Sequence, residues 1–274
     1  MTTTVILTAG LAAIAPVADG GGFEPPSLDD FYPEAFALAG TAFELNRVML
    51  VRIIMTLVLV ALFGIGAARA KVVPGRMQNL LEMILEFVRK NIAVEILGEK
   101  YGARYTPIIT TIFLGVFFLN ISGILPGLQI ASTGVVGMPL VFAIASYIAF
   151  VYAGVRANGV ARFVKGALVP TGVPGFLYPL IVPVEFLSTF ILRPLTLTIR
   201  LMANMISGHL LLSLCFLATN ALFVYATAQL KILGTITFVA GIVFILLEAF
   251  VAALQAYIFA LLSAVYIESS VHMH

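Results

Sequence analysis

The sequence predicts an all-α integral membrane protein with about five transmembrane helices, one amphipathic surface helix and a long tilted antiparallel hairpin at its C-terminal end. Of the 274 residues, 61% are apolar and only 10% are charged, against about 25% charged residues in a typical soluble domain. The mean hydropathy is +1.11. These values exclude a disordered chain and an ordinary soluble enzyme. The net charge of +2, with no basic stripe, gives no reason to expect a nucleic-acid partner.

Residues 1–45 form an acidic arm that we expect to lie mostly outside the membrane. No Lys or Arg precedes Arg47, whereas six acidic residues do. The apolar stretch at 5–17 lacks the basic residues that open a signal peptide. We therefore predict two parts, the arm at 1–45 and a membrane domain at 46–274.

Two different elements follow the arm. Residues 48–68 are apolar apart from Arg52 and Thr56 and are long enough for a first transmembrane helix. Within 77–97, apolar residues recur at helical spacing with charged residues between them, and Glu86 precedes Lys90 by the favourable interval of four. This pattern predicts an amphipathic helix on the membrane surface; a soluble helix packed on a partner is the alternative.

Four further apolar runs complete the membrane domain. Residues 107–125 and 137–155 each match the bilayer thickness, and a basic loop follows the second of them at 156–165. The last two runs, 181–219 and 232–267, are nearly twice as long as a span requires. We therefore expect these two to form the hairpin and to be strongly tilted or curved.

The distribution of Lys and Arg predicts the orientation of the chain. Residues 69–104 contain seven of them and the loop at 156–165 contains three, whereas the loop at 123–136 contains none. Basic loops stay in the cytoplasm when a bacterial plasma membrane protein inserts. This places the C-terminus in the cytoplasm and the acidic arm outside.

A few charged and polar residues fall inside the last two runs. A charge at mid-bilayer costs about 2.5–3.5 kcal/mol on insertion scales, so such a residue is a functional candidate by default. The alternative is a structural Arg–Glu pair that holds two helices together. The candidates are Glu185, Arg193, Arg200, Glu248, Asn204, His209 and Gln255.

An antiparallel hairpin would place these candidates on definite levels. In such a hairpin the residue numbers rise along one helix and fall along the other, so two residues at the same depth have numbers that add up to nearly the same total. This rule pairs Arg200 with Gln255 and His209 with Glu248. His209 lies about 13 Å along the helix from the level of Arg200, and Glu248 about 10 Å from that of Gln255, both towards the neutral loops. Glu185 marks another polar level near the basic side.

The chemistry of these side chains suits proton handling. Arginine stays protonated and cannot relay protons, whereas His and Glu titrate and suit a water-filled half-channel. We therefore predict that Arg200 separates two offset proton paths. One path passes His209 and Glu248, and the other lies near Glu185.

Two segments resemble a known family. Residues 192–209, LRPLTLTIRLMANMISGH, resemble the signature of subunit a of the bacterial F-type (F1Fo) ATP synthase, and 247–266, LEAFVAALQAYIFALLSAVY, resemble its last helix. Asn120 with Pro126 resembles the family's Asn-x-x-x-x-x-Pro region. The resemblance covers about 40–268.

The resemblance implies a role for each candidate. Arg200 would be the essential stator arginine facing the rotor-ring carboxylate, with Asn204 and Gln255 as polar support. His209 and Glu248 would form one half-channel, and Glu185 would belong to the other. The family fold also implies a hairpin that curves around the ring.

The resemblance further implies a non-catalytic, proton-translocating subunit without cofactor or metal. Its partners would be the c-ring, the peripheral-stalk b subunits, the remaining F1Fo subunits and membrane lipid. We expect a bacterial plasma membrane, with the mitochondrial inner membrane as the alternative. His272 and His274 are expected to lie in a solvated tail rather than in a metal site.

Two other readings stay open at this point. A secondary transporter could bind an anionic substrate at an intramembrane Arg, but it would favour inverted repeats, and the two halves show none. A membrane scaffold would tolerate replacement of Arg200, His209 or Glu248 with only a loss of stability.

Overall fold

The computed structural model describes residues 45–125, 132–168, 177–224 and 231–272. The regular elements in these ranges are all helices, which confirms the predicted all-α class. Among the described residues, five segments are long and apolar enough to cross a membrane. The predicted acidic arm lies outside the described residues except for Leu45, so the division at 45/46 stays a prediction.

The first helix and the predicted surface helix are both present. α2 spans Arg47–Ala68 and begins where the Asn46 side chain accepts a hydrogen bond from the Met49 backbone N–H at 2.8 Å, an ordinary N-cap. The predicted surface helix corresponds to α3 (Arg76–Val88), the π-helical η2 (Arg89–Val94) and the first turn of α4 (Glu95–Ile121). Its position on the membrane surface stays a prediction.

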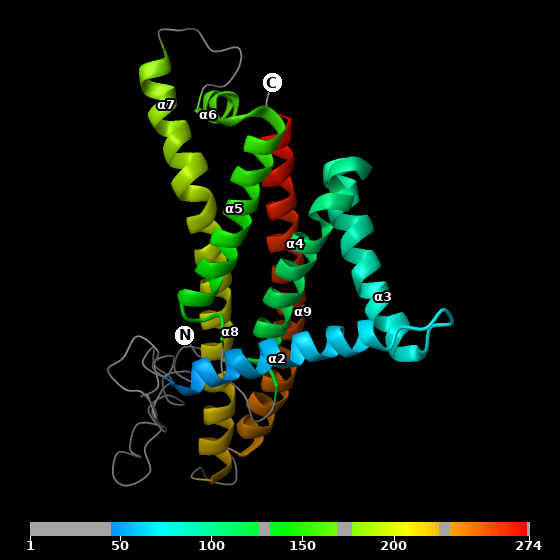
Figure 1. The fold of residues 1–274 in the computed structure, drawn as a ribbon. Coiled ribbons are helices and arrows are strands. Elements are labelled where there is room, and N and C mark those ends of the chain that lie inside the picture. The colour runs from blue at the N-terminus through cyan, green and yellow to red at the C-terminus, as the bar shows by residue number, and fades with distance from the viewer. Residues whose placement is uncertain (1–44, 126–131, 169–176, 225–230, 273–274) are drawn as a thin grey trace. The chain divides into compact units, whose positions relative to one another are not determined.

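The helical path breaks at Gly98, between η2 and the body of α4, and Figure 1 shows the chain folding back between α3 and α4. Gly98 has φ 70° and ψ 172°, a conformation open almost exclusively to glycine. Four residues on, a β-carbon at Gly102 would stand 2.9 Å from the carbonyl oxygen of Ala93. Two glycines therefore make this tight helical turn possible.

α5 (Gly137–Asn158) is followed by a helix where the sequence predicted a loop. Gly159, with φ 80°, separates it from α6 (Val160–Leu168), which covers most of the expected basic loop at 156–165. α6 buries Phe163 and Ala167. The ring of Phe163 fills the space beside Gly154, where a β-carbon would overlap it, so packing against α5 stabilises this short helix.

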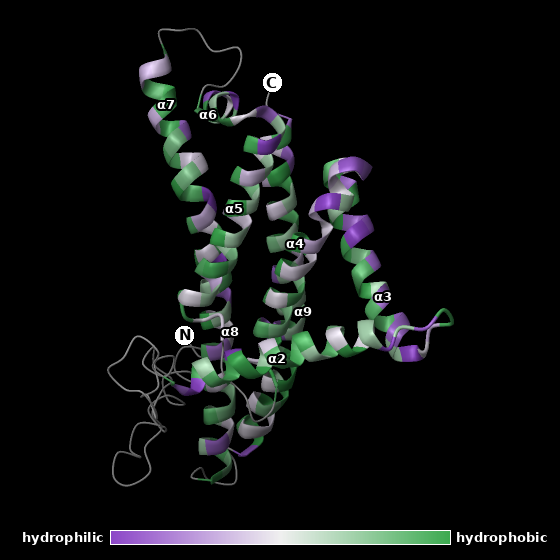
Figure 2. Ribbon diagram, in the orientation of Figure 1, coloured by the Kyte–Doolittle hydropathy of each residue, from purple (hydrophilic) through white to green (hydrophobic). Residues whose placement is uncertain are grey.

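The two C-terminal runs are even longer than predicted. α7 (Tyr178–Phe186), the π-helical η4 (Leu187–Leu192) and α8 (Arg193–Val224) form one segment of 47 residues, and α9 (Lys231–Val271) has 41 residues. Hydrophobic residues dominate these helices, whereas α3 carries many hydrophilic ones (Figure 2).

Two compact units are described separately. One contains Leu210–Leu246, in which the Thr219 hydroxyl donates to the Thr237 hydroxyl at 2.8 Å. The other contains Phe31–His209 and Leu247–His274 and holds the core of α4, α5, α8 and α9. Within the described residues, one cluster of this core consists of seven buried side chains: Ile112, Val116, Ala143, Leu197, Leu201, Ala256 and Phe259.

Candidate functional site: the polar residues of α8 and α9

Arg200 lies on α8 with an exposed side chain. Its guanidinium makes no hydrogen bond or ion pair with any residue of the described ranges. Ala203 and Ser207, on the same helical face, are also exposed, and Asn204 is half-buried. A permanent charge on a membrane helix, bordered by the exposed Ile199, is costly against lipid alone. This face therefore calls for a polar partner.

Glu248 on α9 has the opposite environment. Its side chain is only 6% exposed, and neither carboxyl oxygen has a hydrogen-bond partner in the described part of the chain. The carboxyl group lies against α8, with Oε1 3.1 Å from the point where a β-carbon of Gly208 would stand. Burying an unpartnered carboxyl group costs free energy and so destabilises the fold. A contribution to stability therefore does not explain why an acid stands at position 248.

The contact between Gly208 and Glu248 sets the level of His209. His209 directly follows Gly208 on α8 and is half-buried, so the hairpin places it on the level of Glu248, as the constant index sum predicted. On α9, Gln255 is buried seven residues after Glu248, which puts the two side chains on nearly the same helical face.

Glu185 occupies a separate place on α7. It is half-buried, and a carboxyl oxygen accepts a hydrogen bond from Thr189 in η4 at 3.3 Å. The structure thus brings Gly208, the residue before His209, against Glu248, and Glu185 lies fifteen positions before Arg200 on the same helical segment.

Arg193 has neighbours that sequence reasoning did not identify. The central carbon of its guanidinium lies 5.1 Å from the ring centroid of Tyr266 and 5.5 Å from that of Phe150. Nη1 also donates to Ser269 Oγ at 3.5 Å. No sequence pattern links α5, α8 and α9 in this way, because the helix pairing that joins them is tertiary.

Arg52 also has a partner that the sequence did not reveal. Its Nε and Nη2 both donate to the Ser132 carbonyl oxygen, at 3.0 and 2.9 Å. Nearby, Thr133 donates to the side-chain oxygen of Asn120 at 2.7 Å, and the hydroxyls of Ser122 and Ser132 lie 2.9 Å apart. These contacts tie α2 and the end of α4 to the turn before α5.

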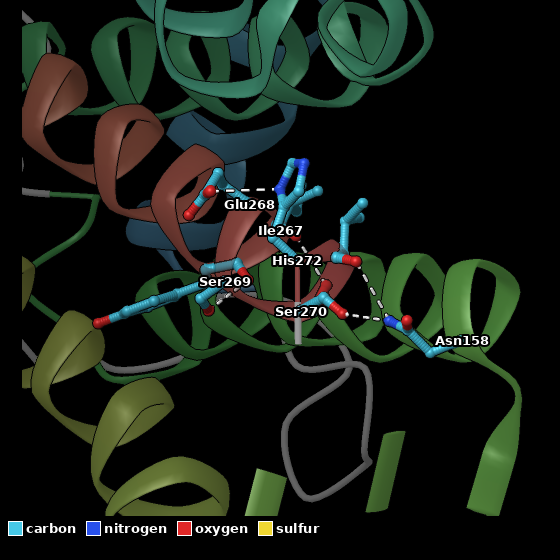
Figure 3. A network of polar contacts seen from close by, with 8 residues as sticks. Asn158, Ile267, Glu268, Ser269, Ser270 and His272 are labelled. Atoms are coloured by element: carbon cyan, nitrogen blue, oxygen red, sulfur yellow. Dashed lines mark hydrogen bonds and ion pairs between the residues drawn. The ribbon is translucent and has the colours of Figure 1, made fainter. Parts of the chain in front are cut away.

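The C-terminal end of α9 is anchored rather than loose (Figure 3). The Asn158 amide of α5 donates to the carbonyl oxygens of Ser270 and Val271 at 3.0 and 3.2 Å. His272 Nδ1 lies 3.2 Å from Glu268 Oε1, although both side chains are partly exposed. His272 is exposed, as expected for a solvated residue, although it follows directly on the last turn of α9; His274 lies outside the described residues.

Comparison with known proteins gives a consistent answer. The family model of the ATP synthase A chain matches residues 49–268. ATP synthase subunit a of Rhodococcus erythropolis is 48% identical over 250 residues, covering 91% of each chain. The subunit a proteins of Paenarthrobacter aurescens and Frankia alni are 34% and 36% identical and cover 96% and 93% of this chain, and 98% and 88% of their own. None of these matches supports the transporter reading. The chain therefore belongs to the ATP synthase subunit a family.

Proposed function

We propose that Arg200 separates two offset half-channels in this chain, which by its family is a proton-translocating stator subunit of the Fo sector of ATP synthase. The observation that carries the proposal is the contrast between two groups. Arg200 is exposed on a face that contains small residues, whereas the carboxyl group of Glu248 is buried against Gly208.

The two groups suit different steps of proton transfer. Glu248 and His209 can accept and release protons, so they form the path from the side of the neutral loops. Arg200 keeps its charge and attracts the ionised form of a rotor carboxylate that passes its exposed face. Glu185 serves the exit towards the basic side, and Asn204 and Gln255 provide polar support near Arg200.

Partners and orientation form part of the same proposal. The exposed face of Arg200 would meet the c-ring, and other surfaces would meet the peripheral-stalk b subunits, the remaining F1Fo subunits and lipid. The chain itself is non-catalytic. The actinobacterial relatives and the basic segment 69–104 favour a bacterial plasma membrane, with the N-terminus outside and the C-terminus in the cytoplasm.

The test is Arg200→Ala in the complete complex, reconstituted into lipid vesicles. We expect ATP-driven acidification of the vesicles to be lost while ATP hydrolysis by the assembled complex can still be measured. Arg156→Gln is the matched control, because Arg156 is an exposed arginine near the end of α5. Normal acidification by the Arg200→Ala complex would refute the proposal.

A further inference from the structure

We propose that Arg193 is a positioning residue that fixes the rotation of α8 about its axis and thereby the direction of Arg200. This inference rests on the role proposed for Arg200. It assigns a function to an intramembrane charge that the proton path does not use.

Arg193 on α8 makes three contacts with side chains of α5 and α9. Its guanidinium carbon lies 5.5 Å from the Phe150 ring of α5 and 5.1 Å from the Tyr266 ring of α9. Its Nη1 reaches Ser269 of α9 at 3.5 Å. Within the described ranges, the ion pairs are Lys90–Glu86 and His272–Glu268. The charge of Arg193 is therefore stabilised by aromatic faces rather than by a carboxylate.

A planar guanidinium suits this place better than an ammonium group. The side chain borders a small cavity shared by Ala143, Ser146, Tyr147 and Leu197. A flat group can stack on ring faces and still direct an N–H towards a hydroxyl, whereas the ammonium of Lys is a compact, strongly hydrated point charge. Arg193→Lys should therefore keep the charge and lose the fixed orientation.

Arg193 is connected to Arg200 by uninterrupted helix. α8 begins at Arg193, and seven residues at 100° each return to within about 20° of the same direction, about 10.5 Å along the axis. The two arginines thus share one helical face. A rotation of α8 at Arg193 would turn Arg200 by the same angle.

The element before Arg193 is not a regular α-helix. η4 (Leu187–Leu192) is π-helical and immediately precedes α8. A π-helical turn is rare and has wider i→i+5 hydrogen bonding than the α-helix. This turn shifts the phase between the side chains of α7 and those of α8, and Arg193 is the first side chain beyond it.

The experiment compares four variants in the complete complex with Cys215 replaced by Ser. Arg193→Gln and Arg193→Lys remove the stacked guanidinium. Tyr266→Phe removes only the hydroxyl and keeps the aromatic ring on which Arg193 stacks. Arg156→Gln is the matched control, because Arg156 also stacks on a ring, Tyr152 at 5.8 Å, but at an exposed site on α5.

Two readouts separate positioning from a general structural role. The first is ATP-driven acidification of vesicles per assembled complex. The second is disulfide formation between cysteines placed at Ala143 on α5 and Leu197 on α8, two members of one buried cluster. The yield of this disulfide reports the rotation of α8 and is normalised to assembled subunit.

We expect both Arg193 variants to lose about tenfold in acidification and to form markedly less disulfide, whereas Tyr266→Phe and Arg156→Gln keep both. If Arg193→Gln prevents assembly, Arg193→Lys carries the test. An assembled Arg193→Lys complex with wild-type acidification and disulfide yield would overturn the inference. Arg200→Ala, measured in parallel, distinguishes this failure from failure of the proposed function.

Discussion

The carboxyl group of Glu248 lies so close to Gly208 that its Oε1 would be 3.1 Å from a β-carbon at that position. A methyl group on residue 208 would be tighter than ordinary van der Waals contact with the carboxyl group. The absence of a side chain at Gly208 is therefore what allows a buried acid to sit against α8.

Gly208→Ala should displace the Glu248 carboxyl group without breaking α8, because alanine is a better helix former than glycine. We expect ATP-driven acidification by the reconstituted complex to fall about tenfold, with normal assembly. Gly64→Ala is the control, because nothing lies within 4 Å of a β-carbon there. Wild-type acidification with Gly208→Ala would show that the carboxyl group need not occupy this position.

Gly98→Ala should destabilise the turn between η2 and α4. The φ of 70° with ψ of 172° at Gly98 is strained for alanine by about 1–3 kcal/mol, although nothing lies within 4 Å of the added carbon. Thermal unfolding of the purified complex measures this loss of stability. The rate of protease cleavage near residue 98 measures the loosening of the turn itself. A Gly98→Ala protein as stable as the Gly64→Ala protein would contradict the assigned backbone conformation.

Arg52→Met should loosen the turn that precedes α5. Two N–H groups of Arg52 donate to the Ser132 carbonyl oxygen, and hydrogen bonds to charged groups contribute about 1.5–3 kcal/mol. Because Arg52 is only half-buried, we expect a cost near the lower value. Hydrogen–deuterium exchange over residues 132–140 should rise, while exchange in α9 stays constant; unchanged exchange in both would exclude the anchoring role.

Two serines that join α5 to α9 should respond unequally to replacement. Ser146 donates to Ser263 Oγ at 2.8 Å, and Ser263 donates in turn to the Phe259 carbonyl oxygen. Ser263→Ala leaves a buried donor without its acceptor, at a cost of about 1–3 kcal/mol, whereas Ser146→Ala leaves Ser263 bonded and should cost less. Thermal unfolding of both variants measures the difference, and equal costs would argue against this direction of donation.

Much of the fold could be predicted from the sequence because its signals are local. Apolar length fixed the spans, and charge spacing indicated the helix that became α3 and η2. The turn at Gly98 could not be predicted, because no sequence pattern marks a glycine that adopts a positive φ. The same holds for α6, where the charges of Arg162 and Lys165 obscured the buried Phe163.

The polar residues of the hairpin were predictable to the same extent. A charge in an apolar run stands out, and the constant index sum placed His209 on the level of Glu248. The sequence could not show that Gly208 is the contact residue, or that Arg193 stacks on Phe150 and Tyr266. Those contacts depend on how three helices pack, and composition carries no information on that packing.

The exposed guanidinium of Arg200 has a consequence for the biogenesis of the complex. Before its partner arrives, the newly inserted subunit must hold this charge against acyl chains, where it draws in water and thins the bilayer around it. The unassembled subunit is therefore energetically unfavourable in a lipid bilayer. Under the proposed function, cells that make the subunit gain from coupling its synthesis to that of the rotor and from removing the surplus by proteolysis.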